Sequence, residues 1–382
     1  MKILHIANHL NTGGITTYLL TLVREQTLAG HEVFIWASRG QCLEAFYDRT
    51  RRVISDVPRC KSELSPRLWA QLPRMIRFLK ENQIDIVHTH SRVAQVLSAV
   101  ATRCVGIPYL STAHMFYKRR LGRRLFPCWG KRIIAISNVM AEGLNTIFGP
   151  KNLPPVTVVM NGVDMETLRK KIAQVNRTEI RKAYGYGPQD RVVLSLSRLI
   201  PVKGVHILIE AFTIALKEEP HLKLLVAGIG DEDYERQLKS MVSELGLSGS
   251  VQFVGDQTAI EKPFKAADIF VGAYLWPEAF GLSVLEAMAV GLPVITSRSG
   301  GLVDLLGNGK RGLLFEQGNC EALAQCIVRY VREPALQAQV VATASRSIEE
   351  YSSKRMFAGV QQVYEEVLKP YREDKVSLAL VP

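Results

Sequence analysis

Two acidic side chains, Glu278 and Glu286, are separated by seven residues, with a Phe-Gly turn between them. After this turn, apolar residues recur at helical spacing, which predicts a helix beginning near Leu282. Glu278 should therefore lie in the loop before the helix, and Glu286 about one turn inside it. The free N–H groups at the start of a helix bind anions. Two carboxylates beside such a site suit a ligand with a phosphate in the middle and hydroxyl groups at both ends, as in a nucleotide-sugar.

Two cationic side chains form a second candidate site. Arg198 and Lys203 follow a short apolar run that predicts a strand, and a helical pattern comes next. Two cations at the carboxyl end of a strand can converge on a diphosphate, arginine through paired hydrogen bonds and lysine as a point charge. Cationic side chains can take the place of a metal ion beside a diphosphate. We therefore expect that this site needs no metal ion and no cofactor.

These segments closely resemble the signatures of the retaining glycosyltransferases of family 4 (glycosyl transferases group 1), which have the GT-B fold. The run from Pro277 to Pro293 resembles the family's E-x7-E segment, and the run from Ser197 to Gly204 resembles its R-x4-K signature. Asp304 stands where the family usually has Glu. The resemblance extends over most of the chain through further segments: Gly13-Gly14, Gly30-His31-Glu32-Val33 and Asn161-Gly162-Val163-Asp164.

The resemblance implies a role for each matching residue in the donor site. Glu286 would bind the ribose hydroxyl groups, and Glu278 those of the donor sugar. Arg198 and Lys203 would hold the diphosphate. The backbone of Phe280, Gly281 and Leu282 and the glycine turn at Gly14 would approach the phosphates.

His114 follows another predicted strand and matches the family's cleft histidine, which contacts the donor sugar near the bond that breaks. The family often has Asp at the next position, where this chain has Met115. Catalytic roles therefore fall on Glu278, His114, Arg198 and Lys203. His88 and His90 share one face of a strand and could pair on a metal. No third ligand is evident from the sequence, so we expect them to serve packing, and we assign no metal ligand.

Short apolar runs alternate with helical patterns along the whole chain, which indicates parallel sheets covered on both faces. We expect two facing Rossmann-like, doubly wound domains with a cleft between them. The predicted bounds are 1–165 for an acceptor-side domain, 166–355 for a donor-side domain, and 356–382 for a helix that crosses back, with a tail. The strands are predicted at 2–7, 32–37, 84–88, 109–112 and 133–136, then at 192–195, 222–227, 251–254, 269–271 and 293–296.

A Gly-x-Gly motif, Gly228-Ile229-Gly230, follows one predicted strand. The third glycine of the dinucleotide fingerprint is replaced by Asp233, and the acidic residues around it would repel a pyrophosphate. This motif argues against an NAD-dependent enzyme.

The formal net charge of +12 lies entirely in the first 165 residues, which hold 22 Lys and Arg against 10 Asp and Glu. Nucleic acid would attract the same charge, but we find no motif for binding it. Basic residues mixed with Phe and Trp instead suit an anionic membrane surface or an anionic, lipid-linked acceptor. The residues expected to contact it are Lys118, Arg119, Arg120, Arg123 and Arg124.

Bulk properties agree with a two-domain cytoplasmic protein. A chain of 382 residues with 47% hydrophobic content exceeds one typical core. Its start predicts a strand and not a signal peptide, and no apolar run is long enough to span a bilayer. The six cysteines show no metal-ligand spacing, so we expect reduced thiols. Together with the basic first domain, this places the expected enzyme on the inner face of the cell membrane.

The favoured function is transfer of a sugar, with retention, from a UDP- or GDP-sugar to an anionic or lipid-linked glycan in cell-surface polysaccharide or glycolipid synthesis. Front-face attack, with the leaving phosphate taking the acceptor proton, is commonly proposed for the family. Two alternatives stay open: a nucleotide-sugar epimerase of the same architecture, and a non-catalytic nucleotide-sugar binding protein.

Overall fold

The computed structural model describes residues 1–60, 62–117, 121–257 and 259–379. The chain divides into two compact units. Unit 1 is Met1–Gly162 together with the segment from Ser353 onward, and unit 2 is Val163–Ser352. The unit boundaries thus lie three residues before each domain boundary suggested by the sequence.

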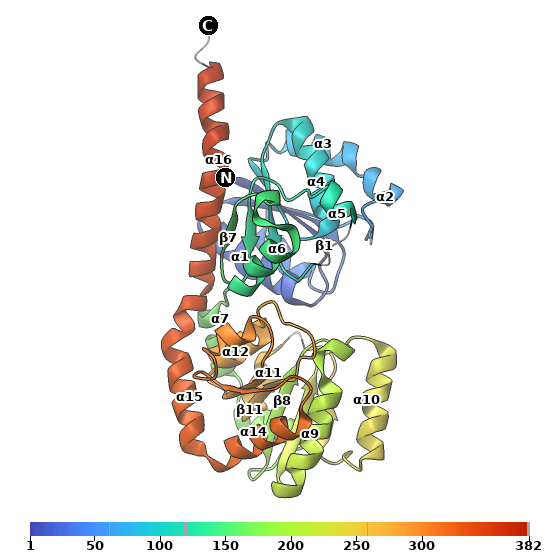
Figure 1. Ribbon diagram of the computed structural model, residues 1–382, viewed down its shortest axis with the longest axis vertical. Coiled ribbons are helices and arrows are strands. Elements are labelled where there is room, and N and C mark those ends of the chain that lie inside the picture. Colours follow the sequence, from blue (N-terminus) through green and yellow to red (C-terminus); the bar gives the residue numbers. More distant parts are fainter. Residues whose placement is uncertain (61, 118–120, 258, 380–382) are drawn as a thin grey trace. The chain divides into compact units, whose positions relative to one another are not determined.

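Unit 1 (Figure 1) is built on a parallel sheet. The order of its strands is β3-β2-β1-β4-β5-β6-β7. The chain starts in the middle of the sheet, winds to one edge, returns and continues to the other edge, which is the order of a doubly wound fold. The strands are β1 (Lys2–His9), β2 (Glu32–Ser38), β3 (Arg52–Ile54), β4 (Ile86–Thr89), β5 (Tyr109–Ala113), β6 (Ile133–Ala135) and β7 (Val156–Val158).

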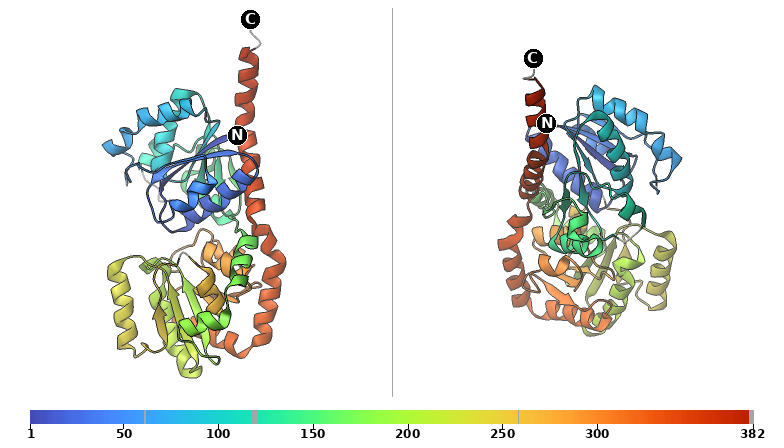
Figure 2. Two further views of the ribbon diagram at one scale, coloured as in Figure 1. Left: turned by 180° about the vertical axis from the view of Figure 1, so that it is seen from behind. Right: turned by 45° about the horizontal axis from the view of Figure 1, so that its top comes forward.

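Helices cover both faces of this sheet because successive side chains of a strand point to opposite faces. Ile3 packs with α1 and α16 in one cluster, while Leu4 packs with α3 and α4 in another. Figure 2 shows α16 running alongside unit 1. The helices are α1 (Gly14–Leu28), η1 (Glu44–Arg49), α2 (Pro66–Trp69), α3 (Leu72–Glu81), α4 (Arg92–Val105), α5 (Leu121–Leu125), α6 (Asn138–Phe148), η2 (Pro150–Asn152) and α16 (Ser353–Ala379).

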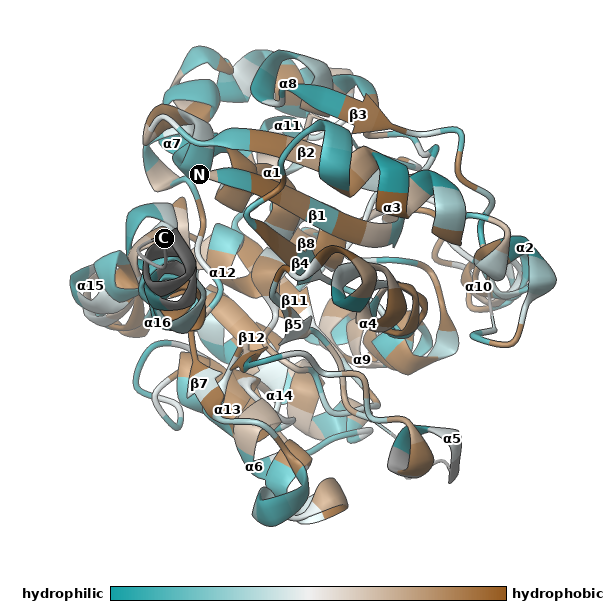
Figure 3. Ribbon diagram, turned by 90° about the horizontal axis from the view of Figure 1, so that it is seen from above, coloured by the Kyte–Doolittle hydropathy of each residue, from teal (hydrophilic) through white to brown (hydrophobic). Residues whose placement is uncertain are grey.

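Unit 2 repeats this arrangement with the strand order β10-β9-β8-β11-β12-β13. Figure 3 shows how strongly hydrophobic its central strands are, as expected for strands buried on both faces. The strands are β8 (Arg191–Leu196), β9 (Leu222–Ala227), β10 (Val251–Phe253), β11 (Ile269–Gly272), β12 (Val294–Ser297) and β13 (Leu313–Phe315).

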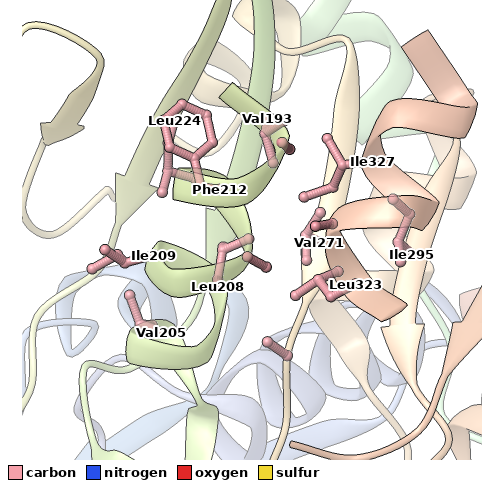
Figure 4. Packing of buried hydrophobic residues seen from close by; sticks show 14 of the residues in the cluster. Val193, Val205, Leu208, Ile209, Phe212, Leu224, Val271, Ile295, Leu323 and Ile327 are labelled. Carbon is pink, nitrogen blue, oxygen red and sulfur yellow. The ribbon is translucent and has the colours of Figure 1, made fainter. Parts of the chain in front are cut away.

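One face of this second sheet packs against α9, α10 and α14. Val193, Leu224 and Val271 of the sheet meet Phe212 of α9 and Ile327 of α14 in one buried cluster (Figure 4). The helices are α7 (Met165–Gln174), α8 (Arg177–Ala183), η3 (Pro201–Lys203), α9 (Val205–Glu218), α10 (Glu232–Glu244), α11 (Glu261–Ala266), α12 (Leu282–Ala289), α13 (Leu302–Leu305), α14 (Cys320–Arg332), α15 (Pro334–Ser347) and η4 (Ile348–Tyr351).

The predicted fold class is confirmed, since both units hold an all-parallel sheet in doubly wound order. All ten predicted strands are present, with ends shifted by at most two residues. Three further strands, β3, β7 and β13, were not predicted. Each has three residues and lies at the edge of a sheet, where burial is least and the apolar signal is weakest.

Candidate functional site

The predicted donor residues of unit 2 follow β8 and β11, and the loops after β9 and β12 lie beside them. These strands are neighbours in the sheet, so their loops lie along one edge. Backbone hydrogen bonds tie the loops together: Leu275 donates to Val202, and Gly301 donates to the carbonyl of Glu278. Ligands of doubly wound sheets bind at this edge.

The loop after β8 carries both predicted cations. Arg198 is exposed, and no described residue pairs with its guanidinium group. Lys203 ends the short helix η3, and Gly204 follows in the left-handed region at φ 66°. A Cβ at Gly204 would lie 1.8 Å from the carbonyl oxygen of Ala273. Only glycine permits this close packing, so Gly204 sets where Lys203 sits.

Lys203 and Glu278, predicted from separate motifs, meet in the structure. Lys203 Nζ lies 2.5 Å from Glu278 Oε2, and both side chains are largely shielded from solvent. The same ammonium group lies 4.8 Å from the centre of the Tyr274 ring. The ion pair and the aromatic face hold the lysine on the loop that carries Glu278.

The Gly300-Gly301 turn positions the Glu278 loop. A Cβ at Gly300 would lie 2.2 Å from the carbonyl oxygen of Glu278, and one at Gly301 would lie 2.6 Å from that of Ala279. Side chains at these positions would push the loop away.

Helix α12 begins beside this loop, as predicted. Gly281 is its N-cap, and Phe280 is buried against Tyr351. The first N–H groups of the helix have no partner within it and can receive an anion. Glu286 is the fifth residue of the helix and is partly buried, and burial raises the pKa of its carboxyl group to about 7.

Tyr274 is a site residue that the sequence did not reveal. Its hydroxyl group lies 3.3 Å from Ser283 Oγ on α12. Burial is the main cause of a raised pKa for Tyr274, and the charges of Glu278 and Glu286 add to it. The ring therefore lies close to both predicted carboxylates. No motif marks it, because an isolated tyrosine after a strand has no distinctive spacing.

The predicted residues of unit 1 follow β1 and β5. Gly14 is exposed at the start of α1, after Gly13 as N-cap. His114 follows β5, is partly buried, and contacts the Tyr18 ring edge-on at 4.8 Å between centres. Burial lowers the pKa of His114 to about 3, so the ring is neutral at physiological pH.

A third histidine, His5, joins His88 and His90, contrary to the sequence analysis, which found no third ligand. Their candidate ligand nitrogens lie within 4.8 Å of one another. All six ring nitrogens, however, have hydrogen-bond partners among the described residues. The geometry thus supports the packing interpretation over a metal site.

The predicted basic surface needs one correction. Arg123 is only 6% exposed and lies between the rings of Tyr117 and Trp129, at 4.5 and 4.3 Å. It donates to Gln95 Oε1, and burial lowers its pKa to about 10. Arg123 therefore stabilises the interior and cannot meet a membrane. Lys118, Arg119, Arg120 and the side chain of Arg124 lie outside the described residues.

Comparisons with known proteins agree with this geometry. The model of the family described as "Glycosyltransferase Family 4" matches residues 12–167, and that described as "Glycosyl transferases group 1" matches residues 176–347. A phosphatidyl-myo-inositol mannosyltransferase of Mycobacterium leprae is 26% identical over 93% of both chains. An alpha-monoglucosyldiacylglycerol synthase of Streptococcus pneumoniae is 28% identical over 79% of this chain and 72% of its own.

The fold has close counterparts among solved structures. Anabaena HepE, solved in complex with UDP-glucose, superposes with a TM-score of 0.83, covering 96% of this chain and all of its own at 22% identity. In the described part of this chain, no helix combines the length and the apolar character that a membrane crossing requires. The two family matches together cover residues 12–167 and 176–347, which hold every predicted donor residue, and the chain therefore belongs to the family 4 glycosyltransferases with the GT-B fold.

Proposed function

We propose that this enzyme transfers a sugar, with retention and without a metal ion, from a UDP- or GDP-sugar to a lipid-linked or anionic glycan acceptor. The observation that carries the proposal is the cluster of Lys203, Glu278, Tyr274 and Glu286, with Arg198 beside it, at the carboxyl edge of the second sheet. The complex of the similar HepE protein with UDP-glucose supports a nucleotide-sugar donor.

The donor roles follow from chemistry and from the family resemblance. Arg198, whose guanidinium group is exposed, and Lys203 bind the diphosphate together with the first amides of α12. Glu286 accepts hydrogen bonds from the ribose, and Glu278 accepts them from the transferred sugar. Lys203 must then exchange its bond to Glu278 for one to the diphosphate, which frees that carboxylate for the sugar.

In the proposed reaction, the bond between the anomeric carbon and the diphosphate oxygen breaks, and the acceptor hydroxyl attacks from the same face. The departing diphosphate takes the acceptor proton. Arg198 and Lys203 stabilise the negative charge that develops on the leaving oxygen, as electrostatic catalysis requires. These two cations supply the charge that a metal ion supplies in other transferases.

Exposed apolar side chains of unit 1 support an acceptor in or on a membrane. Leu125 and Phe126 are 64% and 67% exposed, and Leu64 is 82% exposed. Arg92 connects the segment of Leu64 to that of Phe126, because it donates a hydrogen bond to the carbonyl oxygen of Phe126 and forms an ion pair with Glu63. Apolar side chains within a strongly basic domain suit an anionic bilayer surface, which in this proposal is the cytoplasmic face of the membrane.

The proposal is tested by thermal unfolding with UDP, GDP, ADP and their sugar conjugates. A ligand at 100 times its Kd should stabilise the protein by about 2.7 kcal/mol. Glu286→Ala and Arg198→Ala should abolish the shift. The control is Arg191→Ala, because Arg191 is exposed at the opposite end of the same strand.

If no nucleotide stabilises the wild type, the donor site is refuted. If a nucleotide does stabilise it, product analysis separates the proposed transferase from the two alternatives. An epimerase converts the donor with no acceptor present, and a binding protein shows the thermal shift without turnover.

A further inference from the structure

A chain of hydrogen bonds runs through the buried interior of unit 1 and ends at His114. Gln26 Oε1 lies 2.8 Å from His5 Nε2, and His5 Nδ1 lies 3.0 Å from His90 Nε2. His90 Nδ1 in turn lies 3.0 Å from His114 Nε2. Gln26, His5 and His90 are nearly inaccessible to solvent. The proposed mechanism uses none of these three side chains.

The rings of His5, His90 and His114 are neutral at physiological pH, so each carries one proton on a ring nitrogen. Burial lowers the pKa of His5 to about 4, and that of His90 lies well below its ordinary value for the same reason. A neutral imidazole has one donor nitrogen and one acceptor nitrogen. Setting the proton on one ring therefore sets the proton on the next.

Gln26 sets the direction of the chain. Its amide oxygen can only accept, so His5 Nε2 carries the proton and His5 Nδ1 accepts from His90 Nε2. By the same logic, His90 Nδ1 accepts from His114 Nε2. The proton of His114 is thus on Nε2, and Nδ1 keeps its lone pair. No described residue forms a hydrogen bond to His114 Nδ1.

A second branch couples the same Gln26 amide to His88. Gln26 Nε2 donates to the hydroxyl group of Tyr364 on α16, at 3.2 Å. That hydroxyl group lies 2.7 Å from His88 Nδ1, while His88 Nε2 lies 2.6 Å from Thr112 Oγ1. If the Gln26 amide turned over, Tyr364 would have to donate to it. His88 would then change tautomer together with the three rings of the first chain.

We propose that Gln26, His5 and His90 are positioning residues that hold His114 as the Nε2–H tautomer, so that Nδ1 accepts a hydrogen bond from a hydroxyl group of the transferred sugar. This inference rests on the proposed function, because it takes the ligand to be a nucleotide-sugar. No proton moves along the chain. The neutral acceptor nitrogen selects an uncharged hydroxyl group and offers nothing to an anionic phosphate.

The tautomer can be read directly by NMR. In protein labelled with ¹⁵N-histidine, His114 of the wild type should show a protonated Nε2 and an unprotonated Nδ1. Gln26→Met removes the orienting acceptor and should give a mixture of tautomers. Gln26→Glu should restore the wild-type pattern, because its carboxylate also accepts from His5. His206, which is bonded to Tyr234 in unit 2, should be unchanged in every variant and serves as the internal control.

A binding measurement on the same variants tests the role of the tautomer. Gln26→Met should weaken the binding of the nucleotide-sugar roughly 3- to 10-fold, the effect of about one neutral hydrogen bond, and should leave that of the free nucleotide unchanged. Gln26→Glu should recover the affinity.

A protonated Nδ1 on His114 in the wild type would overturn the inference, as would equal weakening for nucleotide and nucleotide-sugar. If no nucleotide binds at all, the proposed function fails, and the acceptor role of His114 fails with it. The NMR pattern still decides whether Gln26 orders the chain.

Discussion

Lys203 links the predicted cation motif to the predicted carboxylate motif through its pair with Glu278. Its removal should impair catalysis far more than it lowers the stability of the fold. Lys203→Ala should lower kcat/KM by roughly 100-fold, since it takes one cation from the leaving diphosphate. The pair with Glu278 is partly exposed, so the free energy of unfolding should change by no more than about 1 kcal/mol.

Steady-state kinetics and urea unfolding check this prediction. Lys217→Ala is the control, because Lys217 lies exposed in the last turn of α9. Full activity in Lys203→Ala, or an equal loss in the control, would contradict it.

The pKa of Glu286 near 7 predicts a pH dependence of donor binding. Ribose hydroxyl groups donate to the ionised carboxylate, so affinity should fall as the pH drops below about 7, by up to tenfold per unit. Titration calorimetry between pH 5.5 and 8.5 measures this fall. A nucleotide-sugar is the appropriate ligand, because the terminal phosphate of a free nucleotide itself titrates near pH 6. Glu286→Gln should give a flat profile, and a fall of equal slope in that variant would assign the titration to another group.

The same raised pKa makes the stability of the fold change with pH in the opposite direction. Burial disfavours the ionised carboxylate, which raises the pKa from its ordinary value of 4.5 to about 7. The contribution of Glu286 to stability is therefore greatest at low pH and falls as the pH rises through this interval. Improved binding and reduced stability between pH 4.5 and 7 would both come from one carboxyl group.

At the scale of elements, glycines let the loops of unit 2 pack against one another. Gly228 illustrates this, because a Cβ there would lie 1.9 Å from the carbonyl oxygen of Ser197. The Gly-x-Gly motif that argued against an NAD site thus supports the loop of Arg198. Asp231 also donates its N–H to Leu199 of that loop.

Gly204 and Gly246 form a matched pair for testing this packing. Both lie in the left-handed region, at φ 66° and 69°, but a Cβ at Gly246 would meet no atom within 4 Å. Gly246→Ala should therefore cost about 1 kcal/mol of stability from backbone strain alone, and donor binding should persist. Gly204→Ala adds a clash with Ala273, so it should cost several kcal/mol and abolish the thermal shift with nucleotide. Similar losses in both variants would show that backbone strain, and not close packing, is the reason that position 204 requires glycine.

For the whole molecule, the asymmetry of charge predicts membrane binding through unit 1. The wild type should bind vesicles of anionic lipid, and high salt should weaken that binding by screening. Phe126→Ser removes an exposed apolar side chain and should weaken binding roughly 10-fold. Leu28→Ser, at a 71% exposed position at the end of α1, should have no effect. Co-sedimentation with vesicles checks both variants, and equal binding by all three proteins would remove the basis for membrane contact.

A charge-reversal variant for the same test should replace Lys118, Arg119 and Arg120 by Glu. Arg123 must be left out, because Arg123→Glu would place a buried acid between the rings of Tyr117 and Trp129 and destabilise the domain.

The sequence by itself determined the two parallel, doubly wound sheets and the loops that carry Arg198, Lys203, Glu278 and Glu286. These features depend on local patterns: buried strands give continuous apolar runs, and helix starts follow turn residues. The short edge strands escaped this reading because they are too brief and too exposed to leave such a pattern.

Only the tertiary structure decided which side chains meet. Lys203 pairs with Glu278 across 75 residues, and Tyr274 joins them, although no spacing marks it. The same holds for Arg123, which reaches Gln95 across 28 residues, and for His5, which lies 85 residues from His90. Contacts between distant segments depend on how strands align in a sheet, and residue spacing along the chain does not carry that information.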